Sequence, residues 1–346
     1  MNRATAAAVL VALATALAGC ASAAPPVAPV APAPSSASTS PSTTGRSGTP
    51  TARHSPTTAA TPSSSASAPA TTGPPAGGAS AGAQLPGGGR TLFPEHRLVG
   101  FAGVPGSRAM GRLGIGDLDD RAQEILEVGE PYADGRKVLP VLELIATIVQ
   151  GAPGRDGKYR SRVSAATVDR HLAAAREVNG ILLLGIQPGR ADFLTEVKHY
   201  ERWLVQPDVG LALDPEWAMG PGQVPMMVFG HTTGAEIDSI AAYLAGLVKA
   251  HDLPEKALVF HQLSPAIVSR QKDIRMHPGV AIIKSVDGIG SPANKVSTWT
   301  KLTKNLPKGV HAGFKLFYEE DRAFGPLMTP KQVLALRPEP DYVLYE

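Results

Sequence analysis

Apolar runs alternate with amphipathic segments through the C-terminal three quarters of this chain. Runs that are rich in β-branched residues and bounded by Gly or Pro are typical of strands buried on both faces. Eight such runs occur, at residues 97–102, 137–144, 180–186, 209–214, 257–262, 280–284, 311–318 and 342–345. We therefore predict eight parallel strands.

The segments between most of these runs have helical spacing. Strands that alternate with helices indicate a parallel sheet. The clearest helix has an apolar stripe at Ile237, Ile240, Leu244 and Leu247. Helix starts are expected at the capping residues Asp117, Ser164, Thr233, Ser291 and Thr329.

These elements predict a single α/β domain of the (β/α)8 TIM-barrel type over residues 91–346. Its 256 residues are close to the roughly 250 that are typical of this fold. The domain would end on the eighth strand, and closure would pair that strand with residues 97–102. The alternative is an open, doubly wound sheet, but the glycine-rich stretch 103–116 lacks the third glycine of a dinucleotide fingerprint.

The first twenty residues have the pattern of a secretory signal, with Arg3 before an apolar stretch that is too short to span a bilayer. The tetrad Leu17-Ala18-Gly19-Cys20 resembles a lipobox. That resemblance implies a signal peptide over residues 1–19 and a lipid such as palmitate on Cys20, which would anchor the protein to the extracytoplasmic face of the cell membrane. The alternative is an ordinary signal peptide with an incidental cysteine, although Cys20 is the only cysteine of the chain.

Residues 21–90 consist mainly of Ala, Pro, Ser, Thr and Gly and contain no acidic residue. Such a segment cannot offset its chain entropy by burial, so we expect a disordered tether over residues 20–90. The first ninety residues hold four of the 33 basic residues, which leaves 29 basic against 30 acidic residues and a net charge of −1 for the rest. This balance gives no reason to expect a nucleic-acid partner.

The active site of a TIM barrel lies at the C-terminal ends of its strands. Carboxylates and aromatic residues gather at these ends here, which favours a carbohydrate ligand. The residues that we expect to contact the substrate are Glu143, Gln187, Trp217, His261, Gln262, Asp287, Lys315 and Tyr318.

Asp214 and Glu216 are the strongest candidates for catalysis. Glycoside hydrolysis needs one protonated carboxyl group and a second group that stabilises an oxocarbenium-like centre. Two residues apart at a strand end, these side chains would project from the same face, and their repulsion would raise one pKa. We expect Glu216 to be the general acid and Asp214 to orient it or to stabilise charge. The alternative is a structural pairing with Lys284 or Lys315.

The stretch from Leu211 to Trp217 resembles the strand 4 motif of family 18 chitinases and family 25 lysozymes, in which an Asp-x-Glu carries the acid. It departs from the lysozymes because the first strand, at residues 99–103, holds no acidic residue. It departs from the chitinases because their repeated Asp residues upstream of the motif are absent. Comparison with the large retaining barrel clan implies Glu319 as nucleophile, although Pro215 replaces the Asn of that clan. A solvated loop of charges is the alternative for Glu319. The domain also resembles uncharacterised secreted actinobacterial barrel proteins, and this resemblance implies no particular reaction.

No cofactor is expected, and the histidines lack the spacing of a metal motif. Lys315 as a Schiff-base lysine is a further alternative. Three hypotheses follow: a glycoside-hydrolase-like barrel that acts on an envelope or external polysaccharide, a non-catalytic protein that binds glycan or a partner through the same mouth, and a solute-binding lipoprotein. A single closed barrel would count against the third.

Overall fold

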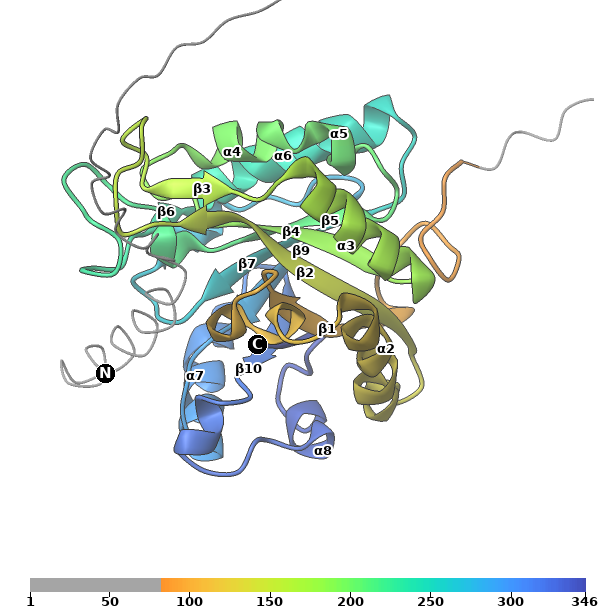
Figure 1. The fold of residues 1–346 in the computed structure, drawn as a ribbon. Coiled ribbons are helices and arrows are strands. Elements are labelled where there is room, and N and C mark those ends of the chain that lie inside the picture. Colours follow the sequence, from red (N-terminus) through yellow and green to blue (C-terminus); the bar gives the residue numbers. More distant parts are fainter. Residues whose placement is uncertain (1–81) are drawn as a thin grey trace, which may run out of the picture. The chain divides into compact units, whose positions relative to one another are not determined.

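A computed structural model describes residues 82–346, which form a closed eight-stranded parallel barrel (Figure 1). Closure is shown by β1, which pairs in parallel with both β2 and β11. This confirms the predicted TIM-type barrel and excludes the open sheet. In the order of their pairing around the barrel, the strands are β1 (His96–Gly103), β11 (Tyr342–Tyr345), β10 (His311–Leu316), β9 (Val280–Val286), β7 (Lys256–Gln262), β5 (Val209–Leu213), β4 (Ile181–Ile186) and β2 (Lys137–Val149).

Helices follow most of the strands and begin where the capping residues predict. Asp117, Ser164, Thr233, Ser291 and Thr329 each accept a hydrogen bond from a backbone N–H of the first turn. The α-helices are α2 (Leu118–Gly129), α3 (Ala165–Glu177), α4 (Phe193–His199), α5 (Glu201–Leu204), α6 (Gly234–Ala250), α7 (Pro292–Thr303) and α8 (Pro330–Leu334).

Between β7 and β9 the described chain has no α-helix. Residues 263–279 contain only β8 (Val268–Ser269), which pairs with β6 (Thr232–Thr233), and a 3-10 helix over Gln271–Asp273. No α-helix from this segment covers the outer side of β9, which contacts α6 and α7 instead.

Side chains alternate between two apolar layers along each barrel strand, as expected for strands buried on both faces. The outer layer packs against the helices. The inner layer fills the barrel, and includes Leu98, Val141, Leu183, Val259 and Ile283, all fully buried. The barrel is thus a packed core near the N-terminal ends of its strands.

The N-terminal ends of the strands are closed by the segment that precedes β1. Leu85 and Leu92 are buried in the inner apolar layer. Arg90 pairs with Asp252 at 2.8 Å, and Glu255 accepts a hydrogen bond from the Leu92 N–H at 2.7 Å. Packed residues therefore begin before the expected boundary at residue 91. The expected signal peptide, Cys20 and most of the expected tether lie outside the described residues.

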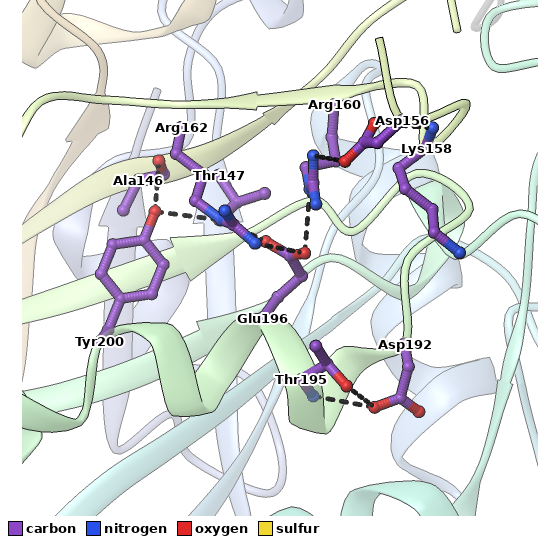
Figure 2. Close-up of polar contacts among 10 residues, drawn as sticks. All are labelled: Ala146, Thr147, Asp156, Lys158, Arg160, Arg162, Asp192, Thr195, Glu196 and Tyr200. Carbon is purple, nitrogen blue, oxygen red and sulfur yellow. Dashed lines mark hydrogen bonds and ion pairs between the residues drawn. The ribbon is translucent and has the colours of Figure 1, made fainter. Parts of the chain in front are cut away.

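A hairpin formed by β2 and the antiparallel β3 (Arg160–Arg162) is fixed to α4 by one buried carboxylate (Figure 2). Glu196 is fully buried and accepts hydrogen bonds from Arg160 Nε at 2.9 Å and Arg162 Nε at 2.7 Å. The Tyr200 hydroxyl donates to the Ala146 carbonyl oxygen at 2.7 Å. Because a buried carboxylate needs such partners, these contacts hold the end of β2 in place beside the mouth of the barrel.

No helix within residues 82–346 has both the length and the apolar character needed to cross a membrane.

Candidate carboxylate site at the C-terminal ends of the strands

The inner face of the barrel changes from apolar to polar toward the C-terminal ends of its strands. Since inward positions recur every second residue, each polar residue follows an apolar one by two positions on the same face. Thus Val141 is followed by Glu143, and Ala212 by Asp214. The same step leads from Val259 to His261, from Ile283 to Ser285 and Asp287, and from Leu344 to Glu346.

Glu143, Asp214, Asp287 and Glu346 line a small cavity of about 50 Å³ in the barrel mouth. The cavity brings together most of the residues that the sequence predicts as substrate contacts, together with both predicted catalytic residues of strand 4. Its polar and aromatic lining consists of Glu143, Gln187, Asp214, Glu216, Trp217, Asp287, Lys315, Phe317 and Glu346.

His261 links two carboxylates beneath this cavity. Its Nδ1 lies 2.9 Å from Asp287 Oδ2, and its Nε2 lies 3.1 Å from Glu143 Oε1. Burial opposes a charge on the ring, but the carboxylates of Asp287 and Glu143 raise the pKa of His261 well above its usual value. Both ring nitrogens therefore donate, and His261 is an imidazolium at neutral pH.

The two carboxylates that His261 binds are held in the ionised form. Although burial acts in the opposite direction, the charges of His261 and Lys315 lower the pKa of Asp287 to about 2. The Ser285 hydroxyl also donates to Asp287 at 2.9 Å. Burial acts to raise the pKa of Glu143, but the charge of His261 lowers it below its usual value. Glu143 also accepts a hydrogen bond from the Tyr342 hydroxyl at 2.7 Å.

Lys315 adds a second positive charge to the network. Its Nζ lies 2.5 Å from Glu346 Oε2 and 3.5 Å from Asp287 Oδ2. Burial acts to lower the pKa of Lys315, but these acids raise it well above its usual value. A Schiff-base lysine needs a neutral amine, so the structure does not favour that alternative.

Asp214 and Glu216 form no ion pair with any residue that the structure describes, although the charges of His261 and Lys315 are near enough to act on Asp214. Pro215 begins a 3-10 helix (Pro215–Trp217) directly after β5, so the two side chains face the cavity from a turn and not from the extended strand that the spacing argument assumed. Both are buried, and Glu216 Oε2 has no hydrogen-bond partner among the described residues. A ligand or a water molecule in the cavity is therefore the natural partner of that oxygen.

Burial and the neighbouring charges together give these two acids different protonation states. It raises the pKa of Asp214 to about 6, an effect that the nearby charges of His261 and Lys315 oppose. Burial, followed by the charges of Asp214 and Asp287, raises the pKa of Glu216 to about 8. At pH 7 Glu216 is therefore mainly protonated and Asp214 mainly ionised.

Four predicted site residues do not line the cavity. His261, which the sequence predicts to contact the substrate, is fully buried beneath it, and the other three lie elsewhere. Gln262 faces outward on β7, where its side chain donates to the Ser264 carbonyl oxygen at 2.9 Å. Tyr318 and Glu319 line a neighbouring cavity of about 320 Å³. Glu319 is more than half exposed and pairs with Arg108, so it does not face Glu216 in the carboxylate cavity.

Two other expectations about side chains also change. Lys284 cannot pair with Asp214 or Glu216 in the mouth, because it points outward from β9. Trp217 is 2 % exposed and packs against Val149 and Phe229, so only part of its surface faces the cavity. It is therefore a wall of the cavity and not an open platform for a sugar ring.

Sequence reasoning missed Ser285, Phe317, Tyr342 and Glu346. Alternation along the strands could have found two of them, because Ser285 follows the apolar Ile283 by two positions and Glu346 follows Leu344 in the same way. No group of three or more His, Cys, Asp or Glu side chains that could hold a metal ion occurs within residues 82–346.

Comparisons with known proteins give little further information. No protein-family model matches the chain, and no curated protein matches it. Nine chains of solved structures match. One of them, described as a hyperthermophilic endo-beta-1,4-glucanase in complex with substrate, has a TM-score of 0.35 and 8% identity, and the match covers 67% of this chain and 82% of that one. With similarity this low, a function has to be argued from the residues of this chain.

Replacement of Glu216 by Gln is expected to change the pH dependence of stability. Because the pKa of Glu216 is about 8 when folded and its ordinary value is 4.5, the folded state binds more protons than the unfolded state between these values. The free energy of unfolding of the wild type therefore falls, relative to that of Glu216→Gln, as pH rises from about 4.5 to 8. We expect a difference on the order of 2 to 4 kcal/mol.

Urea unfolding at pH 5 and pH 8.5 measures this difference. Glu127→Gln, at an exposed position on α2, is the control and should follow the wild type. If the free energy of unfolding changed with pH by the same amount in Glu216→Gln and the wild type, the pKa of Glu216 would not be raised in the folded state.

Proposed function

We propose that the barrel is a glycoside hydrolase that acts on an envelope or external polysaccharide, with Glu216 as the proton donor. One observation carries the proposal: a buried carboxyl group with a pKa of about 8 and an unpartnered oxygen lines the same cavity as an ionised carboxylate. Acetal cleavage needs these two groups together.

In the proposed reaction, Glu216 transfers its proton to the glycosidic oxygen as the bond from that oxygen to the anomeric carbon breaks. Asp214 and Asp287, both negative at pH 7, stabilise the positive charge that develops on the sugar. A water molecule then adds to the anomeric carbon, and a carboxylate accepts its proton. The position of Glu319 in the neighbouring cavity gives no support to a role as nucleophile.

Incubation of the protein with peptidoglycan, chitin and plant-type glucans, followed by reducing-end assays, tests the proposal. Glu216→Gln should lower kcat at least 100-fold, because general-acid catalysis contributes roughly 10² to 10⁴. The kcat/KM of the wild type should be highest between about pH 6 and 8, where Asp214 is ionised and Glu216 is protonated. Glu127→Gln is the control and should keep full activity.

Activity that survives in Glu216→Gln with an unchanged pH profile would remove Glu216 as the donor.

The position of Glu319 supports a second candidate, a protein that binds glycan at the mouth without cleaving it. Glu319 is the expected nucleophile, but it lines the neighbouring cavity and not the cavity that Glu216 lines. Glycan binding of equal strength in the wild type, Glu216→Gln and Asp214→Asn, without turnover, would favour this candidate.

We further propose that the protein is a lipoprotein held on the extracytoplasmic face of the cell membrane. The lipobox-like tetrad ending at Cys20 and the Pro-, Ala- and Ser-rich segment after it support this. Labelled palmitate should enter the wild type and Ser36→Ala but not Cys20→Ser. Label in Cys20→Ser, or none in the wild type, would contradict the assignment.

A further inference from the structure

A second cavity, of about 450 Å³, lies on the flank of the barrel outside β9. It occurs where the segment between β7 and β9 lacks an α-helix. The C-terminal end of α7 forms one wall, and the loop around the 3-10 helix Gln271–Asp273 forms another. The charged residues that line it are Arg270, Lys272, Lys284 and Lys301. Gln262, Gln271 and Asn305 add side-chain amides.

Lys284 is a buried cation that has no counter-ion within residues 82–346. Its side chain is 2 % exposed, and its Nζ donates to the Leu302 carbonyl oxygen at 2.6 Å and to Gln271 Oε1 at 3.0 Å. An ammonium group has three donors, so one is left. Within residues 82–346 no carboxylate lies within ion-pair distance of Lys284, whereas the equally buried Lys295 pairs with Asp321 at 2.9 Å.

An unpaired buried charge is costly, so such charges are normally neutralised or paired. Burial lowers the pKa of Lys284 to about 8, which leaves the ammonium mainly charged at pH 7. The positive charge is therefore retained on a residue that lines the cavity.

The other charged residues of the cavity are also positive. Lys272 and Lys301 are exposed and have no ion-pair partner among the described residues, and Arg270 pairs with Asp273 at 2.7 Å. Of the described residues that line the cavity, none is Asp or Glu. Three unpaired ammonium groups around one space stabilise a group with two negative charges more than a group with one.

We propose that this flank cavity binds the phosphate group of a soluble phosphomonoester, with Lys284 as the buried contact and Lys272 and Lys301 at the rim. The exposed Arg270 and the side-chain amide of Asn305 are further donors to the phosphate oxygens. The volume of the cavity leaves room for the organic part of the ligand. This site is separate from the carboxylate cavity and does not depend on the proposed hydrolase activity.

Isothermal titration calorimetry on the full chain in detergent tests the proposal at pH 7. The probes are inorganic phosphate, glucose 1-phosphate, dimethyl phosphate and acetate. Phosphate and glucose 1-phosphate should bind at least 10-fold more tightly than dimethyl phosphate and acetate, which carry one charge. Equal binding of dimethyl phosphate would point to a phosphodiester, as in a lipid headgroup, and would overturn the proposal.

Three variants locate the site. Lys284→Met should weaken phosphate binding at least 10-fold without loss of thermal stability, because it removes an uncompensated buried charge. Lys301→Met should weaken it about threefold, whereas Lys304→Met, next to the same helix end but outside the cavity, should not. If Lys284→Met fails to fold, the Lys301 and Lys304 pair decides. Unchanged binding in Lys301→Met and in any folded Lys284→Met would overturn the proposal.

Discussion

His261 binds two buried carboxylates at once, and the electrostatics of the barrel mouth depend on this contact. Glu143 and Asp287 come from opposite parts of the barrel wall, and without a cation between them one would have to take up a proton. With His261 and Lys315 in place, both stay ionised. Burial and the negative charges of Asp214 and Asp287 together then favour the protonated form of Glu216, which forms no ion pair with any described residue. Glu216 is therefore the residue of the site that holds a proton at neutral pH.

The rest of the fold keeps these groups close together and buried. Closure of the sheet brings strands that are distant in the sequence around one axis, and the apolar inner layer fills the barrel below the polar layer. The segment that carries Leu85 and Leu92 closes the other end of the barrel. The contact of Glu196 with two arginines holds the end of β2, whose Val149 N–H donates to Gln187 at 3.1 Å on the wall of the cavity.

Much of the fold could be predicted because the signals are local. The eight apolar runs, their Gly and Pro boundaries and the capping residues each act over a few residues. The placement of Glu143, Asp214, His261 and Asp287 in one mouth follows from strand position alone. Strand periodicity could also have excluded Gln262 and Lys284, since each is adjacent to an inward residue, His261 or Ser285, and must therefore face outward.

Other features depend on contacts between residues far apart in the sequence. The pairing of Glu319 with Arg108 joins two loops that are 211 residues apart and moves Glu319 away from the carboxylate cavity. His261 and Glu143 are 118 residues apart. In the sequence, the lack of a helix between β7 and β9 shows only as a segment without helical spacing. The flank cavity cannot be predicted from that segment, because it depends on how the loop that replaces the helix packs against α7.

The central claim is that Glu216 holds a proton at neutral pH. Carbon-13 NMR of the side-chain carboxyl groups, with Glu216 assigned by its absence in Glu216→Gln, measures this directly. The account predicts a titration midpoint near 8 for Glu216, after Asp214 has titrated near 6. A Glu216 midpoint near 4.5, the ordinary value for a glutamate, would contradict it.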